Sequence, residues 1–133
     1  MRAFAICATL AAFAPPPANA QITLGVHLAT SHSAPGLNDS NPGLYIQLAN
    51  GFIAGSYFNS WRRQSNYVGI TLPVFDGAFD VSAVVLSGYR LDPMPAIVPS
   101  KRVSFGNGFG ARISLLLPPN AASAVHFSVE RTI

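Results

Sequence analysis

The chain has 133 residues, of which 50% are hydrophobic and only 10% are charged, whereas a soluble domain usually carries about 25% charged residues. The length predicts one domain, and contact with lipid is one explanation for the shortage of charge. The formal net charge of +3 is small and scattered, which excludes the concentrated basic footprint of a nucleic-acid-binding protein.

Residues 1–20 have the composition of a secretory signal peptide. Met1-Arg2 gives a positive start, residues 3–14 are apolar, and Ala18-Asn19-Ala20 is a small-residue cleavage site. A buried N-terminal helix or a membrane anchor is the alternative, but the apolar run is too short to span a bilayer and a proline triplet ends it. We therefore expect cleavage after Ala20 and a single domain over residues 21–133.

The only cysteine, Cys7, lies in the predicted leader. The mature chain would then hold no disulfide and no thiolate metal site. No metal-ligand spacing, phosphate-binding glycine loop or nucleotide motif is present in the sequence. No cofactor is expected.

After Ala20, apolar and polar residues alternate, which is the pattern of β-strands with two different faces. Asn50-Gly51 predicts a type I′ hairpin turn, which needs positive φ at both residues. Further tight turns are expected at 75–78 and 106–108. The alternation predicts eight strands, at 22–28, 43–49, 52–58, 67–72, 79–87, 96–105, 109–117 and 125–133.

The connections between these strands alternate between long and short along the chain. This layout is typical of an all-β, eight-stranded antiparallel up-and-down β-barrel of outer-membrane type. The polar face is rich in glycine and small hydroxyls, which suit a narrow lumen. The apolar face should then point outward, with Leu24, Val26, Ile113, Leu115, Phe127 and Val129 among its residues. A soluble periplasmic barrel or sandwich is the alternative.

Several motifs follow the same order as in a known family. His27 lies near the end of the first strand, and Asn59-Ser60-Trp61 opens the loop after the third. A Pro-x-Pro-x-x-x-Pro segment, residues 93–99, precedes the sixth strand, and Leu117-Pro118-Pro119-Asn120 follows the seventh. In these motifs the chain resembles the lipid A palmitoyltransferases of Gram-negative outer membranes, which are eight-stranded barrels with an acyl-chain pocket in the lumen.

The resemblance implies an outer-membrane enzyme that moves an acyl chain from a phospholipid to a glycolipid. Its partners would be membrane lipids, namely phospholipid and lipopolysaccharide, and the barrel would be a monomer. The sequence departs from the family in three respects. Asn59 replaces the family's aspartate, the amphipathic N-terminal helix is missing, and the loops are shorter.

The first catalytic hypothesis joins His27, Asn59 and Ser60. A serine hydroxyl is a weak nucleophile until a base takes its proton, and histidine is a suitable base. Asparagine can orient an imidazole but cannot stabilise its cation as a carboxylate does. The alternative is that His27 is a hydrogen-bonded lumen residue and Ser60 an ordinary turn residue.

A second hypothesis places His32 with Asp39 and Ser40, all in the first long loop, where Asp39 could supply the missing carboxylate. The alternative is local Asx-turn chemistry before Asn41-Pro42-Gly43.

Several other polar and aromatic residues have expected places. An interior ion pair is expected between Arg112 and Glu130, with Asp80 and His126 beside it. Arg62, Arg63 and Arg90 lie in the long loops and suit lipid phosphates, with a plain solvated loop as the alternative. Trp61, Tyr67 and Tyr89 suit an interfacial aromatic girdle, with simple packing as the alternative. Three classes of function stay open: an acyltransferase, a non-enzymatic structural or lipid-binding barrel, and a soluble periplasmic binding barrel.

Overall fold

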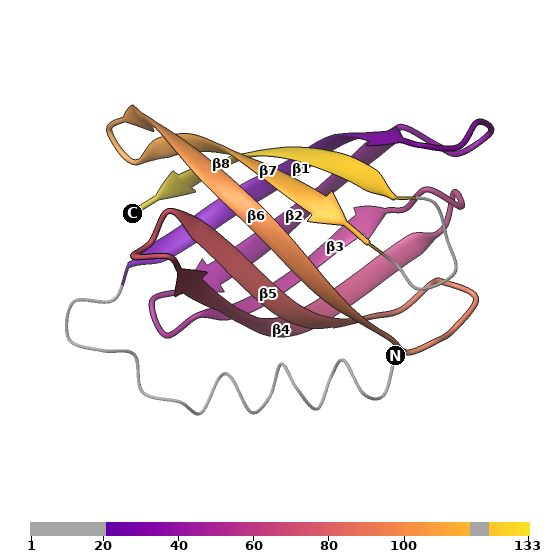
Figure 1. The fold of residues 1–133 in the computed structure, drawn as a ribbon, viewed down its shortest axis with the longest axis horizontal. Helices are drawn as coiled ribbons and strands as arrows, with labels where there is room; N and C mark the ends of the chain where they lie inside the picture. Colours follow the sequence, from indigo (N-terminus) through magenta and orange to yellow (C-terminus); the bar gives the residue numbers. More distant parts are fainter. Residues whose placement is uncertain (1–20, 118–122) are drawn as a thin grey trace.

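The computed structural model describes residues 21–117 and 123–133, which form a closed antiparallel barrel (Figure 1). Each strand pairs with the next in sequence, and the last pairs with the first. The predicted eight-stranded up-and-down barrel is therefore confirmed, whereas the predicted signal peptide lies outside the described residues. The strands are β1 (Ile22–His32), β2 (Ser40–Leu48), β3 (Phe52–Phe58), β4 (Gln64–Val74), β5 (Phe79–Leu86), β6 (Met94–Gly106), β7 (Phe109–Leu116) and β8 (Ala124–Thr132).

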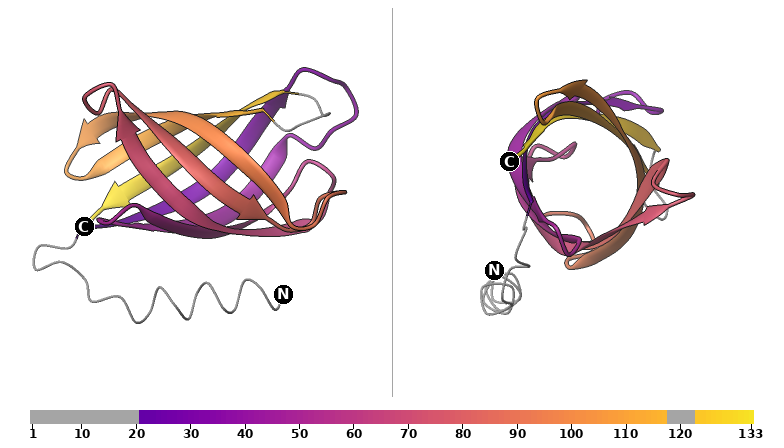
Figure 2. Two further views of the ribbon diagram at one scale, coloured as in Figure 1. Left: turned by 60° about the horizontal axis from the view of Figure 1, so that its bottom comes forward. Right: turned by 90° about the vertical axis from the view of Figure 1, so that its left-hand side faces the viewer.

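The two ends of the barrel differ in their connections (Figure 2). Residues 33–39, 59–63 and 87–93 form what we call the long-loop rim. The tight turns at 49–51, 75–78 and 107–108 form the opposite, turn rim, where Ile22 and Ile133 exchange backbone hydrogen bonds. No helix in the described part of the chain has the length and apolar character needed to cross a bilayer.

The observed strands have between 7 and 13 residues. Four of them, β1, β2, β4 and β6, are longer than alternation alone predicts, and the other four match the predicted length to within one residue. β1 continues through Ser31 to His32, and β4 begins at Gln64, because these polar residues still form cross-strand pairs. Apolar alternation detects only the part of a strand that has one apolar face. The observed lengths are near the 9–11 residues, on average, that a tilted strand needs to cross a bilayer.

The Asn50-Gly51 turn differs from the prediction. Gly51 has a φ of 92°, but Asn50 is not in the left-handed region, and Gly51 N donates to Leu48 O at 2.9 Å. This is a three-residue hairpin loop that ends in a left-handed glycine. Consecutive residues with positive φ occur instead in the other two tight turns, at Phe75 and Asp76 (51° and 54°) and at Asn107 and Gly108 (54° and 79°).

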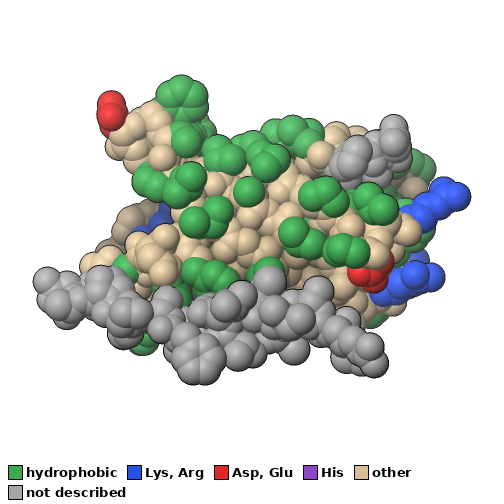
Figure 3. All heavy atoms as spheres, turned by 90° about the horizontal axis from the view of Figure 1, so that it is seen from below, with side chains coloured by type: hydrophobic (Ala, Val, Ile, Leu, Met, Phe, Trp, Pro, Cys, Tyr) green, Lys and Arg blue, Asp and Glu red, His purple; other side chains and the backbone are tan. Residues whose placement is uncertain are grey.

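The apolar faces of the strands point out of the barrel, as predicted. The six residues that the sequence places on that face are each between 39% and 48% exposed. Figure 3 shows hydrophobic side chains spread over the barrel wall between its two ends. A soluble barrel would show the reverse arrangement, with its apolar side chains inside.

The part of the lumen nearer the turn rim, which we call the lower lumen, holds a network of charged side chains. Arg112 Nε donates to Glu130 at 3.0 Å, and its Nη1 donates to Asp80 at 2.8 Å and to Ser100 at 2.9 Å. Arg102 forms a second ion pair with Glu130 at 2.6 Å. The predicted interior ion pair is confirmed, with Asp80 in it. His126 is also buried inside but bonds to His27 and Thr30, away from these charges.

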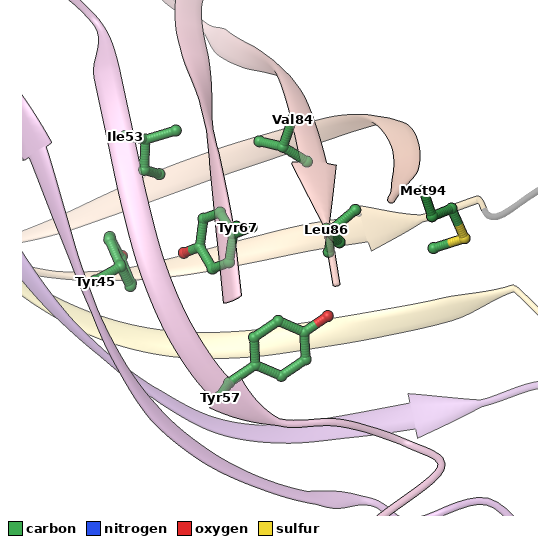
Figure 4. Close-up of a cluster of buried hydrophobic side chains, with 7 residues drawn as sticks. All are labelled: Tyr45, Ile53, Tyr57, Tyr67, Val84, Leu86 and Met94. Atoms are coloured by element: carbon green, nitrogen blue, oxygen red, sulfur yellow. The ribbon is translucent and has the colours of Figure 1, made fainter. Parts of the chain in front are cut away.

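Tyrosines fill much of the lumen above this network (Figure 4). Tyr45, Tyr57 and Tyr67 are all buried, and Tyr57 bonds to Tyr89 through their hydroxyls at 2.6 Å. The predicted place of Tyr67 in an outer aromatic girdle is therefore wrong. The alternation is consistent with this placement, because Tyr67 shares a face with buried Ser65 and opposes outward Val68.

Glycine lets Tyr45 lie flat on the neighbouring strand. A Cβ added to Gly25 would lie 2.0 Å from the Tyr45 ring, so alanine at position 25 must displace this ring, whose hydroxyl bonds to Glu130. We expect Gly25→Ala to lower the free energy of unfolding by about 1–3 kcal/mol, as overpacking usually does. Urea unfolding in detergent, followed by tryptophan fluorescence, measures this. The control is Ala83→Val, which adds volume on the exposed outer face; an equal loss there would contradict the explanation.

Candidate functional site

An irregularity in β1 directs His32 into the barrel. The register with both neighbouring strands shifts between His27 and Ala29, and Leu28 and Ala29 are both exposed. Before the shift the odd residue His27 faces the lumen, and after it the even residues Thr30 and His32 do. A bulge commonly re-aims a side chain in this way. It places the His32 imidazole, whose side chain is only 4% exposed, at the long-loop rim.

Asn38 joins the first two long loops. Its main-chain N–H donates to Ser60 O at 3.0 Å. Its side-chain amide donates to Ser40 O at 2.5 Å and to Asn59 O at 3.3 Å. These bonds hold residues 33–39 against the turn that carries Ser60.

The result is a chain of three side chains across the two loops. His32 Nδ1 lies 2.6 Å from Asp39 Oδ1, and His32 Nε2 lies 2.5 Å from Ser60 Oγ. With its proton on Nδ1, His32 donates to the carboxylate, and Nε2 can accept from the Ser60 hydroxyl. A Ser-His-Asp triad has this arrangement, which is recognised by geometry rather than by order in the chain. Asp39 itself is 68% exposed at its side chain, so the carboxylate meets solvent at the rim.

Asn59 does not face a histidine. It is fully buried, at 0% exposure. Its Oδ1 accepts from the main-chain N–H groups of Trp61 and Arg63 at 2.8 and 3.1 Å. Its Nδ2 donates to Ser65 Oγ at 2.8 Å and to Gly88 O at 3.0 Å. Asn59 therefore shapes the Ser60 turn and ties it to the third long loop.

His27 lies in the lumen, below the rim. Its Nδ1 is 2.8 Å from His126 Nε2, and its Nε2 is 3.0 Å from the Tyr67 hydroxyl. Both ring nitrogens are thus occupied, and the structure does not form the predicted contact between His27 and Ser60. The imidazole beside Ser60 belongs to His32, and the carboxylate of the second sequence hypothesis completes the group. Ser40 takes part only through its backbone, in the local turn around Asn38.

Two features of the site could not be predicted from the sequence. The bulge after His27 has no marker such as glycine or proline in residues 26–30, so simple alternation predicts that His32 faces outward. Asn38 is one of several small polar residues in its loop, and only its contact with Ser60 distinguishes it. The pairing of His32 with Asp39, which the second sequence hypothesis predicts, is confirmed by their contact at 2.6 Å.

A cavity of about 80 Å³ lies in the lumen, between the histidine pair and the charged network. Its wall is partly aromatic and aliphatic, with Tyr57, Tyr67 and Val84, and partly hydroxylic, with Ser82 and Ser100.

Fold and site together define an eight-stranded barrel with a serine–histidine–aspartate group at one rim. No protein-family model matches the chain, and a search of the curated proteins finds no match either. The resemblance to lipid A palmitoyltransferases thus stays a prediction based on its motifs.

Proposed function

We propose that the protein is an outer-membrane enzyme that transfers acyl groups between membrane lipids at its long-loop rim. The observation that carries this proposal is the contact of His32 Nε2 with Ser60 Oγ, with Asp39 on the other ring nitrogen. Nucleophile, base and orienting carboxylate are the three parts that activate a serine hydroxyl.

The proposed reaction has two steps. Ser60 Oγ attacks the ester carbonyl carbon of a lipid donor, and its proton passes to His32 Nε2. The ester C–O bond breaks, and the leaving alkoxide takes that proton, which leaves an acyl group on Ser60. A hydroxyl of the acceptor lipid then gives its proton to His32 and attacks the acyl carbonyl. The bond between Ser60 Oγ and the acyl carbon breaks, and His32 returns the proton to Ser60 Oγ. Asp39 stabilises the imidazolium during both steps.

Few main-chain N–H groups next to Ser60 are free to donate a hydrogen bond to the oxyanion that develops during the reaction. The main-chain N–H groups of Trp61, Arg62 and Arg63 are all bonded to Asn59. We therefore expect the Ser60 N–H to stabilise the tetrahedral intermediate. Preorganised donors of this kind typically contribute a factor of about 100 to 1,000 to the rate.

The lining of the lumen bears on which acyl group the enzyme transfers. Arg112, which is paired with Glu130, lines the cavity together with aromatic and aliphatic side chains, and this lining does not define the length of an acyl chain. The proposed reaction is accordingly acyl transfer from phospholipid to a glycolipid such as lipopolysaccharide, without a commitment to palmitate.

An outer-membrane location is supported by the outer surface. Large hydrophobic side chains are exposed on seven of the eight strands, whereas soluble proteins usually expose such residues singly. At the turn rim, Phe75, Phe79, Phe105 and Phe109 are all exposed, Phe75 to 80%. Lys101 and Arg131 lie 4.9 Å from the ring centroids of Phe79 and Phe109. Aromatic girdles with cations beside them mark the interface of membrane barrels.

The test of the reaction uses the refolded barrel in detergent micelles with a phospholipid donor and a glycolipid acceptor. Mass spectrometry should detect the acylated acceptor and the lysophospholipid in equal amounts. Release of free fatty acid instead would indicate a hydrolase with the same triad. Absence of both products would leave the non-enzymatic lipid-binding barrel as the function.

The proposed outer-membrane location leads to a separate prediction. In a Gram-negative host the protein should sediment with the outer membrane and require detergent for extraction, because its wall presents apolar side chains. Fractionation with a known periplasmic protein as the control measures this. Recovery in the soluble periplasmic fraction would contradict the membrane placement.

A further inference from the structure

The turn that follows the candidate nucleophile is held rigidly. Asn59 N donates to Arg63 O at 2.7 Å, and Arg62 N donates to Asn59 O at 3.0 Å. Arg62 has a φ of 58°, a conformation that costs energy for a residue with a side chain. Three further non-glycine residues with positive φ, Phe75, Asp76 and Asn107, lie in the tight turns of the opposite rim, so this conformation marks a tight turn and is not by itself evidence of function. Here the fixed turn presents Trp61, Arg62 and Arg63 directly after Ser60.

A third arginine belongs to the same rim. The amide of Asn59 binds Gly88 O, so the loop of residues 87–93 is joined to the Ser60 turn. Tyr89 points inward and bonds to Tyr57, while the next residue, Arg90, is exposed. Two loops thus contribute cations to one end of the barrel, where Figure 3 shows basic side chains projecting at the right.

The second point concerns the acidic partners of these three arginines. Within residues 21–117 and 123–133, none of the three forms an ion pair. The two carboxylates of these loops are engaged elsewhere, Asp39 with His32 and Asp92 with the Gly88 N–H at 3.1 Å. Guanidinium groups without a carboxylate partner suit phosphate, which they bind through two parallel hydrogen bonds.

The neighbouring surface indicates what carries the phosphate. Trp61 is 46% exposed, and Leu91, in the third long loop, is 58% exposed. Cations next to exposed tryptophan and leucine match the boundary between headgroups and acyl chains of a membrane. A free anion would gain nothing from the apolar side chains, whereas an amphiphile uses both.

We propose that Arg62, Arg63 and Arg90 bind the phosphate group of a membrane amphiphile beside Ser60. This names the headgroup chemistry of the lipid substrate, and it rests on the proposed placement of the long-loop rim at a membrane surface. The phosphate would fix the lipid so that its ester groups lie within reach of the serine.

Trp61 is the only tryptophan of the chain, so its fluorescence reports on binding next to the arginines. The barrel in maltoside micelles is titrated with dihexanoyl phosphatidic acid, with dihexanoylglycerol and with inorganic phosphate. We expect a saturable change with phosphatidic acid and at least tenfold weaker binding of the other two. Equal binding of dihexanoylglycerol would show apolar contact only, and equal binding of inorganic phosphate a site for free anions; either result overturns the proposal.

The matched variants are Arg62→Asn with Arg63→Gln, since asparagine tolerates the left-handed conformation at position 62. This pair should weaken binding of phosphatidic acid at least tenfold. Lys101→Gln with Arg131→Gln removes two cations at the turn rim and should change it less than twofold. Unchanged binding by the first pair overturns the proposal, provided that its circular dichroism shows a folded barrel; an unfolded pair is replaced by Arg63→Gln alone.

Binding and catalysis are separated with Ser60→Ala. This variant should bind phosphatidic acid as the unaltered protein does, because the hydroxyl does not take part in holding the phosphate. Binding without any acyl transfer in the unaltered protein would retain the lipid site and remove the enzyme. Acyl transfer that is insensitive to loss of the arginines would remove the site and retain the enzyme.

Discussion

Ser60→Ala and His32→Ala are each expected to reduce the rate of acyl transfer by about 100- to 10,000-fold, which is the usual contribution of general acid–base catalysis. The reason is the short contact between His32 Nε2 and Ser60 Oγ, through which the hydroxyl proton leaves. Initial rates of product formation, measured by mass spectrometry in micelles, test both variants. The double variant should be no worse than either single one, because the two residues act as a unit.

The control for these variants is Ser31→Ala, which removes an exposed hydroxyl one residue before His32. Its rate should stay within about twofold of the unaltered rate, as is usual for a surface change. Full activity in Ser60→Ala would remove the catalytic assignment altogether. Full activity in His32→Ala, together with loss in Ser60→Ala, would show that another group is the base.

The barrel could be predicted from the sequence because its causes are repeated along the chain. The same alternation of apolar and small polar residues recurs in most of the strands, and each short connection carries glycine at a tight turn. An error in one strand, such as the early end expected for β1, does not change the number or direction of the strands. The outward placement of Leu24 and Ile113 follows from the alternation as soon as the polar face is assigned to the lumen.

Only part of the site could be predicted from the sequence, because the structural features that assemble it each occur once in the chain. His32, Asp39 and Ser60 were all among the residues singled out, but the sequence joined Ser60 to His27. A single bulge decides between the two histidines, since it exchanges which residues of β1 face inward. One long-range contact, from Asn38 to Ser60, then brings the loops together, and no local pattern encodes it.

Asn59→Asp separates the two interpretations of the Ser60 turn. If position 59 orients the catalytic histidine, as the resemblance implies, a carboxylate there raises acyl transfer. The contacts of Asn59 predict the opposite. Aspartate keeps the acceptor for the Trp61 and Arg63 amides but loses the donor to Ser65 and Gly88. A buried negative oxygen then faces the Gly88 carbonyl, and an unsatisfied buried charge costs more than the 1–3 kcal/mol, roughly, of a neutral group.

We therefore expect Asn59→Asp to lower the free energy of unfolding by about 3 kcal/mol and to reduce acyl transfer, since the turn that holds Ser60 against His32 loosens. Urea unfolding and initial rates measure the two effects on the same preparation. The matched control is Asn50→Asp at the turn rim, where the exposed side chain only accepts a hydrogen bond from the Phe52 N–H and a carboxylate serves equally well. That variant should be neutral within about 0.5 kcal/mol. A gain of activity in Asn59→Asp with unchanged stability would instead assign position 59 to catalysis, and the bonds from Asn59 to the third loop would then be incidental to its role.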